Sequence, residues 1–240
     1  MSRDGGPFGS GYGPGERRAY GRRRGAGARS GGSAPSRPGY GGPRAARLGP
    51  DEIDALLSVV DRVRFVAFDF ETTGLSADRD RVVEIGAVAF RVRKDDGGWV
   101  GVADGAYETL INPGRPIPAA VSAIHGIDDL AVSSAPTFAE AAGELIAFID
   151  GSILVAHNAP FDMGFLRLET ARAGLENPPN PAYDTIAIAK TAISGLPSYS
   201  LKSLASCFGI VQNAAHRGGD DAKVCMELFI KCINLIDTNK

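Results

Sequence analysis

The 240-residue sequence contains no run of about 18 consecutive apolar residues, the length that a membrane-spanning helix requires. Its N-terminus is rich in arginine but lacks the apolar stretch of a secretory signal. The glycines and prolines of the same region oppose the amphipathic helix of a transit peptide. We therefore expect a cytoplasmic protein that makes no association with a membrane.

Cysteine is also scarce. The three cysteines, Cys207, Cys225 and Cys232, form no CxxC pair and are odd in number. Cys225 and Cys232 lie seven residues apart on an apolar stripe. This spacing predicts that they pack in the core of a protein kept in a reducing compartment.

Branched aliphatic side chains are almost missing from residues 1–50. This segment holds 15 of the 31 glycines, 6 of the 15 prolines and 10 arginines, against two acidic residues, so its net charge is +8. Such a segment cannot bury a core and is predicted to be disordered. Residues 51–240 carry 16 basic and 26 acidic side chains, a net charge of −10. The composition therefore predicts a cationic arm over residues 1–50 and an acidic globular domain over residues 51–240.

Within the acidic domain, apolar runs and turn residues predict an α/β fold with a mixed sheet, because three successive strands are followed by alternating strands and helices. Asp51 and Asn158 are expected to cap helices, and Thr137 with Glu140 forms a capping box. The expected strands cover residues 64–70, 82–92, 107–111, 152–157 and 182–184. The expected helices cover residues 52–62, 118–124, 137–149, 158–172, 200–209 and 220–236, with one more after residue 184.

The first motif with catalytic potential is FDFETTGL, in which Asp69 and Glu71 lie two residues apart on an expected strand. Their side chains leave the same face, about 6.6 Å apart along the strand, and can converge on cations. The alternative is a pair of solvent-facing residues at a strand end. Gly74, which follows them, permits close backbone approach, while the neighbouring threonines and Leu75 can contact a phosphate, a sugar or a base.

A second motif, AHNAPFDMGF, places Asp162 in the first turn of a helix that leaves a buried strand. A helix dipole favours a carboxylate there, which is a structural explanation for Asp162. The functional explanation is that ligand clefts form at the C-terminal ends of strands in α/β sheets. His157, in the same motif, is equally explained as a hydrogen-bonded core histidine.

The third motif, HRGGDDA, places His216 five residues before Asp221. If the last helix begins near Asp220, Asp221 points inward and His216 lies on the preceding loop. An imidazole that titrates near neutral pH is a suitable base for taking a proton from an attacking water. Asp220 is expected to cap the helix or face solvent.

These motifs, together with HGI at His125 and YDT from Tyr183, resemble in order and spacing the DnaQ-like 3′–5′ exonucleases with a histidine in the third motif. The resemblance covers about residues 64–236 and is strongest to the proofreading epsilon subunits of bacterial DNA polymerase III. It implies a ribonuclease H-like fold with a five-stranded mixed sheet flanked by helices.

The resemblance also implies roles for individual residues. His216 would activate the attacking water, and two divalent cations, Mg²⁺ or Mn²⁺, would be held by Asp69, Glu71, Asp162 and Asp221. The residues expected to hold the terminal nucleotide are Thr72, Thr73, Gly74, Leu75, His125, Asn158 and Phe161. Relatives usually carry bulkier residues where this chain has Gly218 and Gly219, so we expect a looser His216 loop and slower turnover.

Three functions remain open on the sequence alone. The first is cleavage of single-stranded or frayed 3′ ends of DNA in proofreading or repair, as a polymerase subunit or alone. The second is a 3′–5′ exoribonuclease, and the third is a non-catalytic nucleic-acid-binding protein. The arm combines arginines with Tyr12, Tyr20 and Tyr40, a pattern that binds single strands without sequence preference, although it is also compatible with a solvated extension.

Overall fold

The computed structural model describes residues 46–212 and 215–240. The predicted disordered arm over residues 1–50 therefore falls almost entirely outside the described residues. The helices are α1 (Pro50–Val59), α2 (Ala119–His125), α3 (Phe138–Ile149), α4 (Ala159–Arg172), α5 (Thr185–Ala192), α6 (Leu201–Phe208) and α7 (Gly218–Thr238). The strands are β1 (Arg64–Thr72), β2 (Val82–Asp95), β3 (Gly98–Leu110), β4 (Ile153–Ala156) and β5 (Ala182–Asp184).

The five strands form one sheet in the order β3-β2-β1-β4-β5. β1 pairs antiparallel with β2, which pairs antiparallel with β3. On its other side β1 pairs parallel with β4, and β4 pairs parallel with β5. The prediction of a mixed five-stranded sheet is therefore confirmed.

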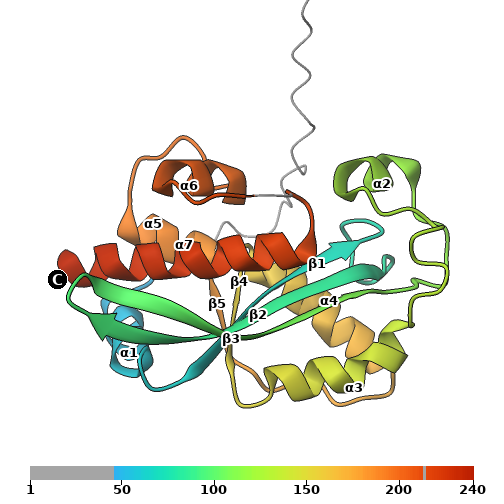
Figure 1. Cartoon of the computed structure of the whole chain (residues 1–240), viewed down its shortest axis with the longest axis horizontal. Coiled ribbons are helices and arrows are strands. Elements are labelled where there is room, and N and C mark those ends of the chain that lie inside the picture. The colour runs from blue at the N-terminus through green and yellow to red at the C-terminus, as the bar shows by residue number, and fades with distance from the viewer. Residues whose placement is uncertain (1–45, 213–214) are drawn as a thin grey trace, which may run out of the picture. The chain divides into compact units, whose positions relative to one another are not determined.

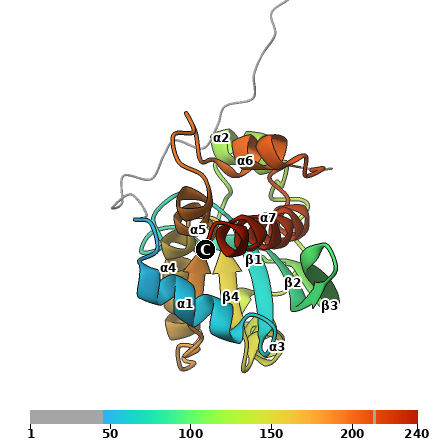
Figure 2. The same cartoon turned by 90° about the vertical axis from the view of Figure 1, so that its left-hand side faces the viewer.

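Helices cover both faces of this sheet because the side chains of a strand alternate between its faces. On β1, Phe65 and Ala67 belong to one hydrophobic cluster with residues of α5, α6 and α7. Val66, Phe68 and Phe70 belong to a second cluster with residues of α3 and α4. Figure 1 shows α7 lying lengthwise over the strands with α3 on the opposite side, and Figure 2 shows α7 end-on.

Two glycines allow α7 to lie directly on the sheet. A Cβ atom on Gly86 of β2 would collide with the backbone of Gly218 and Gly219. In the other direction, a Cβ atom on Gly218 would lie 2.9 Å from the backbone nitrogen of Gly86. Gly218 and Gly219 were expected to loosen the loop of His216. The structure places both in the first turn of α7, where the missing side chain of Gly218 permits the close contact with β2 and that of Gly219 leaves room for the Glu108 carboxylate. Slower turnover stays a prediction.

Element boundaries and caps differ from the prediction, most clearly at β3, α1 and α4. β3 spans 13 residues instead of five, because pairing with β2 along its whole length outweighs a weak strand pattern rich in glycine. α1 has Gly49 as its N-cap, with Asp51 inside the first turn. Asn158 occupies the N-cap position of α4, but its side chain makes no capping hydrogen bond. The capping box of Thr137 and Glu140 is confirmed.

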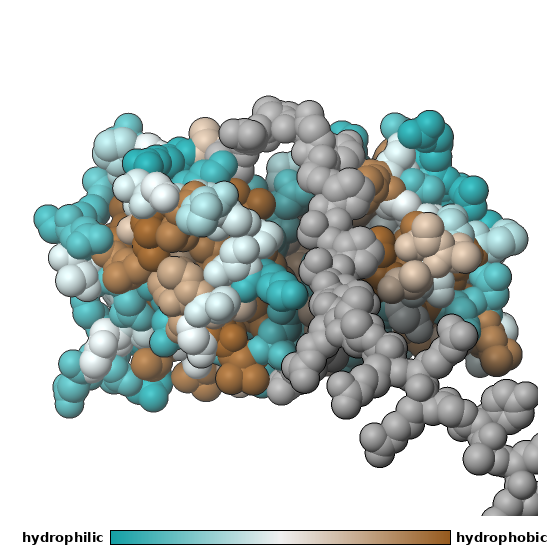
Figure 3. Space-filling model, turned by 90° about the horizontal axis from the view of Figure 1, so that it is seen from above, coloured by the Kyte–Doolittle hydropathy of each residue, from teal (hydrophilic) through white to brown (hydrophobic). Residues whose placement is uncertain are grey.

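The described surface mixes polar and apolar residues. Figure 3 shows, on the face viewed from above, groups of hydrophobic residues separated by hydrophilic ones. Among the helices of the described residues, none combines the length and the apolar character needed to cross a bilayer.

Candidate active site

Four acidic side chains from three elements are buried near the C-terminal end of β1. Asp69 and Glu71 belong to β1, Asp162 to the first turn of α4 and Asp221 to the first turn of α7. Their exposed fractions are 5%, 2%, 1% and 5%. Buried carboxylates are uncommon unless paired or bound to metal, so this group needs an explanation in physical terms.

Asp69 and Glu71 leave the same face of β1, as their spacing predicted. Across the antiparallel pair, Asp69 lies opposite Gly86 and Glu71 lies opposite Glu84. Directly opposed residues place their side chains on one face of the sheet. This is the face that α7 covers, so the helix that carries Asp221 lies over the strand that carries the other two carboxylates.

Asp162 reaches the same strand from α4. Its Oδ1 atom accepts a hydrogen bond of 3.0 Å from the backbone N–H of Phe70. Phe70 is the residue between Asp69 and Glu71, so this bond fixes the Asp162 carboxylate against the segment that carries them. The structure thereby brings together the residues of the first two motifs.

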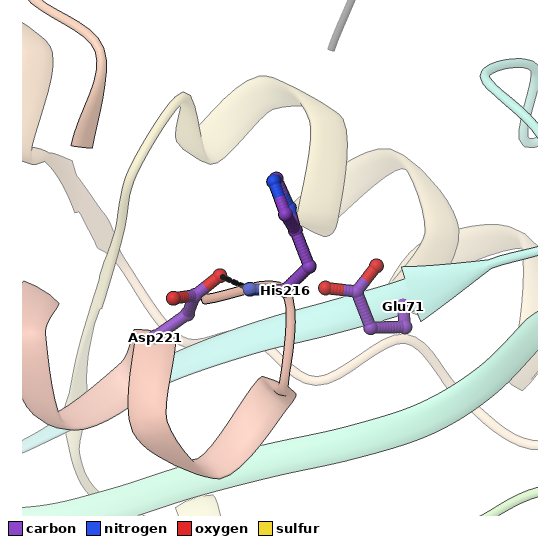
Figure 4. A group of neighbouring side chains, drawn as sticks. All are labelled: Glu71, His216 and Asp221. Carbon is purple, nitrogen blue, oxygen red and sulfur yellow. Dashed lines mark hydrogen bonds between the residues drawn. The ribbon is translucent and has the colours of Figure 1, made fainter. Parts of the chain in front are cut away.

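The third motif closes the site. One ligand atom each from Glu71, His216 and Asp221 lies within 4.8 Å of the other two. Figure 4 shows the Glu71 and Asp221 carboxylates on either side of His216, with the imidazole extending away from the strand. Three of the five residues that the sequence predicted to be ligands or base thus lie together, Asp69 lies on the same strand as Glu71, and Asp162 is bonded to the residue between them.

The Asp221 carboxylate is held by the loop that precedes it. Its Oδ2 atom accepts the backbone N–H of His216 at 3.2 Å, and its Oδ1 atom accepts Nε2 of Gln212 at 2.5 Å. His216 adopts a positive φ of 62°, which few residues other than glycine adopt. The bond to Asp221 therefore helps to keep the loop in a strained backbone conformation.

The donor set fits a hard divalent cation. Carboxylate oxygens are the ligands that Mg²⁺ and Mn²⁺ prefer, and a cation would compensate the charge of carboxylates that are almost excluded from water. The same negative field reaches Cys225 beneath the site. Burial raises the pKa of its thiol well above the ordinary value, and the charges of Asp69 and Asp162 raise it further.

Four of the seven residues expected to hold a nucleotide lie at the end of β1 and in the tight turn that follows it: Thr72, Thr73, Gly74 and Leu75. The hydroxyl of Thr72 donates to the carbonyl of Gly74 at 2.6 Å, and the hydroxyl of Thr73 accepts the backbone N–H of Arg81 at 3.0 Å. A Cβ atom on Gly74 would collide with the carboxylate of Asp80, so a larger residue there would require the Asp80 side chain to move. Leu75, at 38% exposed, remains accessible at the surface.

Three more predicted contacts lie on other elements. His125, at the end of α2, is buried, and its Nδ1 accepts the N–H of Ile127 at 3.0 Å, which leaves the proton of the neutral ring on Nε2. Phe161 is 8% exposed and its ring centroid lies 5.0 Å from that of Phe165, so it packs mainly in the core. Its contact with a nucleotide stays a prediction.

Asn158 occupies a left-handed conformation with φ 71° at the start of α4. Its backbone N–H donates to Oδ1 of Asp184 at 3.0 Å, and the same oxygen accepts the N–H of Ile186 at 2.9 Å. Burial raises the pKa of Asp184, while these backbone hydrogen bonds oppose the shift. His157, the residue before Asn158, is half-buried and forms a 2.8 Å hydrogen bond through Nδ1 with the hydroxyl of Thr185.

Sequence reasoning missed three residues around the carboxylates: Glu84, Gln212 and Arg217. Glu84 gave a usable signal, because it is a charged residue inside the apolar run VVEIGAV. Gln212 and Arg217 gave none, because polar residues in a loop are ordinary and only the folded chain shows what they contact.

Comparison with known proteins shows the family to which the chain belongs. A family model described as exonuclease matches residues 66–229. The chain belongs to the exonuclease family. DNA polymerase III subunit epsilon of Treponema pallidum (strain Nichols) is 43% identical over 182 residues, which are 75% of this chain and 81% of that protein. A longer family member, the epsilon-like protein of Rhodobacter capsulatus, is 38% identical over 177 residues, and the match covers 72% of this chain and only 24% of that protein.

Solved structures of exonucleases share the fold. Exonuclease X in complex with 5′ overhanging duplex DNA superposes with a TM-score of 0.51 at 27% identity, covering 71% of this chain and 90% of that one. Exonuclease I superposes with a TM-score of 0.60 at 19% identity, covering 74% of this chain and 43% of that one. The fold is therefore ribonuclease H-like, as the motif resemblance implied.

Proposed function

We propose that this exonuclease removes nucleoside monophosphates from the 3′ end of DNA in a reaction that depends on divalent cations. The observation that carries the proposal is the meeting of Glu71, His216 and Asp221 within 4.8 Å, beside a strand that Asp162 also contacts. This arrangement combines oxygen ligands with a proton acceptor at one place, which is what metal-assisted phosphodiester hydrolysis requires.

In this proposal Asp69, Glu71, Asp162 and Asp221 hold two cations, Mg²⁺ or Mn²⁺. When bound, such ions stabilise negative charge on the attacking and leaving oxygens of a phosphodiester. His216 takes the proton from the attacking water, because imidazole loses its own proton near neutral pH. The hydrogen bond between the His216 backbone and Asp221 keeps this base beside the carboxylates.

The terminal nucleotide is proposed to lie over the turn after β1. Leu75 offers an apolar surface to a base, and the narrow turn at Gly74 allows close approach of the backbone. His125 presents a donor at Nε2, and Asn158 presents an amide from its left-handed position. The buried residues Thr72, Thr73 and Phe161 are proposed to support this nucleotide-binding region from beneath its surface.

DNA is proposed as the substrate because two relatives point to it. One is a subunit of a DNA polymerase, and the other was solved with duplex DNA that has a 5′ overhang. An association with a polymerase is proposed from the first of these names, and the proofreading role from the motif resemblance. Cleavage of RNA ends would use the same chemistry, so the substrate class has to be measured directly.

The decisive experiment is a time course with single-stranded DNA and RNA of one sequence, labelled at either end, in Mg²⁺, Mn²⁺ or chelator. Wild-type protein is expected to release labelled nucleotides from the 3′ end of DNA only when metal is present. Asp69→Ala is expected to abolish release, while Asp96→Ala, at an exposed turn, leaves it intact. Preferred cleavage of RNA would replace the substrate assignment, and no cleavage of either would favour a binding protein.

The role of His216 has its own signature. His216→Ala is expected to lower kcat much more than it weakens metal binding, because the carboxylates remain. The rate of the wild-type enzyme should rise with pH as an imidazole loses its proton. An unchanged pH profile in the alanine variant would remove His216 from the role of base.

We also propose that the arginine-rich segment preceding the packed residue Leu48 is an arm that attracts polyanions to the acidic domain. The support is the charge, +8 on residues 1–50 against −10 on the rest of the chain. Deletion should stop at residue 45, because Leu48 packs against the core and its N–H donates to Thr191. The deletion is expected to flatten the slope of log affinity against log salt for single strands, whereas replacing its arginines by lysines should preserve the slope.

A further inference from the structure

Glu84 is a buried carboxylate beside the catalytic group but outside the proposed set of metal ligands. It lies on β2 directly opposite Glu71 and is 1% exposed. Opposed residues of an antiparallel pair share a face, and like charges in this position repel each other. A buried negative charge in this place requires donors and a positive partner.

Both come from the residues that follow His216. Arg217 donates to Glu84 through Nε at 3.1 and 3.3 Å and through a terminal guanidinium nitrogen at 2.7 Å. The backbone N–H of Gly218 donates to Oε2 of Glu84 at 2.8 Å. One carboxylate thus receives the planar fork of an arginine and the first N–H of α7, which is a charge-assisted and directional arrangement.

These contacts lie in the chain directly between the proposed base, His216, and the carboxylate of Asp221. Arg217 is the N-cap of α7 and directly follows His216, and Asp221 lies in the first turn of that helix. The adjoining contact between Gly86 and Gly218 brings the backbone of α7 against β2. Movement of Arg217 away from Glu84 would therefore displace the proposed base and the Asp221 carboxylate together.

Charge supports the same arrangement. Hydrogen bonding and ion pairing with Glu84 raise the pKa of Arg217, and Glu108 and Glu71 add to the effect. The guanidinium is therefore the positive partner of a strongly acidic surface next to the site. Lysine would carry the charge but could not present the fork that fits both carboxylate oxygens.

We propose that Glu84 and Arg217 form a positioning clamp, defined by these two side chains and the Gly218 N–H. The clamp holds His216 and Asp221 beside the carboxylates of β1. The clamp deepens the proposed function and rests on it. Neither side chain is assigned a contact with substrate or metal. Their effect is to fix the loop whose backbone is strained at His216.

Three variants test the clamp, and a fourth serves as a control. Glu84→Gln removes the charge and one acceptor, Arg217→Met removes the fork while keeping an apolar stem, and Arg217→Lys keeps the charge alone. Arg91→Met is the matched control, because Arg91 also lies on the β2–β3 side of the sheet and pairs with an acid, Asp104. Since Arg217 is half-exposed, its variants are expected to fold even if Glu84→Gln does not.

Three readouts are measured on the full chain. In Arg217→Met we expect kcat for 3′-nucleotide release to fall about tenfold to a hundredfold, the penalty of a misplaced catalytic group, with KM changed less than about threefold. Arg217→Lys should recover part of the loss, and the double variant with Glu84→Gln should be no worse than the more affected single variant. Mn²⁺ affinity, measured by titration without substrate, should change less than about threefold in Arg217→Met, since the ligands remain.

The third readout does not depend on activity. Backbone hydrogen exchange in the peptide covering residues 215–222 should become about tenfold faster in Arg217→Met and stay unchanged in Arg91→Met. Unchanged exchange in this peptide would overturn the clamp. A loss of kcat that saturating Mn²⁺ restores would also overturn it, because the pair would then act by balancing the charge of the metal ligands and not by positioning the loop. If wild-type protein cleaves nothing, the proposed function fails, and the exchange experiment still decides whether the clamp exists.

Discussion

Asn158 and His216 share a backbone conformation that no other described non-glycine residue adopts, with φ angles of 71° and 62°. Each lies four or five residues before a buried carboxylate, Asp162 or Asp221, at the start of a helix. Each also donates its backbone N–H to an aspartate, Asp184 in the first case and Asp221 in the second. Both loops that deliver carboxylates to the site are therefore held in strained geometry by hydrogen bonds.

The strain at Asn158 predicts different effects on stability for two substitutions. Asn158→Ala should destabilise the fold by about 1 kcal/mol, because alanine adopts the left-handed region poorly. Asn158→Gly keeps that conformation available and should leave the melting temperature close to wild type. If the amide contacts the nucleotide, both variants should raise KM, by roughly twofold to tenfold for one lost hydrogen bond. Equal melting temperatures for the two variants would contradict the argument from strain.

The buried carboxylates predict that removing one of them stabilises the metal-free protein. In chelator, Asp69→Asn should melt roughly 2–4 °C above wild type, corresponding to about 1 kcal/mol of relieved repulsion. Added Mg²⁺ should raise the melting temperature of wild type and have a smaller effect on the variant, because a ligand stabilises only the state that binds it. Scanning calorimetry with and without metal measures both effects, with Asp96→Asn as the control. Equal metal-induced shifts in wild type and Asp69→Asn would show that Asp69 is no ligand.

Gln212 predicts a change in metal affinity. Its amide donates to Oδ1 of Asp221, an oxygen that a cation would also approach. In Gln212→Met this competing donor is absent, and the Kd for Mn²⁺ should fall about threefold to tenfold, the value of one hydrogen bond. Titration of the protein with Mn²⁺ measures the change when free Mn²⁺ is followed by its electron paramagnetic resonance signal. An unchanged Kd would mean that the amide and the ion share the carboxylate.

The reactivity of the three cysteine thiols tests whether α7 packs in the core of the domain. Burial raises the pKa of Cys232 to about 12 and that of Cys225 well above its usual range, whereas Cys207 is exposed. At pH 8 both buried thiols are protonated and shielded, so a disulfide reagent should modify Cys207 alone in the native protein. All three should react after unfolding in denaturant. Reaction of two thiols in native protein would contradict the packing of α7 against the sheet.

Several features were predictable because they depend on local sequence. The nearly continuous apolar run in RFVAFDF predicted β1 as a buried strand, and the two-residue spacing placed Asp69 and Glu71 on one face. The capping box at Thr137 and the helix end at Gly209 depend on side chains within one turn, and both are confirmed. The length of β3 was not predictable, because its strand conformation comes from pairing with β2 and not from its own residues.

The sequence by itself determined the chemistry of this protein: which side chains can bind hard cations, which can accept a proton, and in what order the three motifs occur. Only the tertiary structure decided how those groups are held. Glu84 and Arg217 are 133 residues apart, and Gln212 reaches Asp221 across a loop. Their roles depend on distances through space, and these arise only when α7 lies against β2 at Gly86 and Gly218. A linear pattern records residue types and spacing, whereas a hydrogen bond between remote segments exists only after the chain has folded.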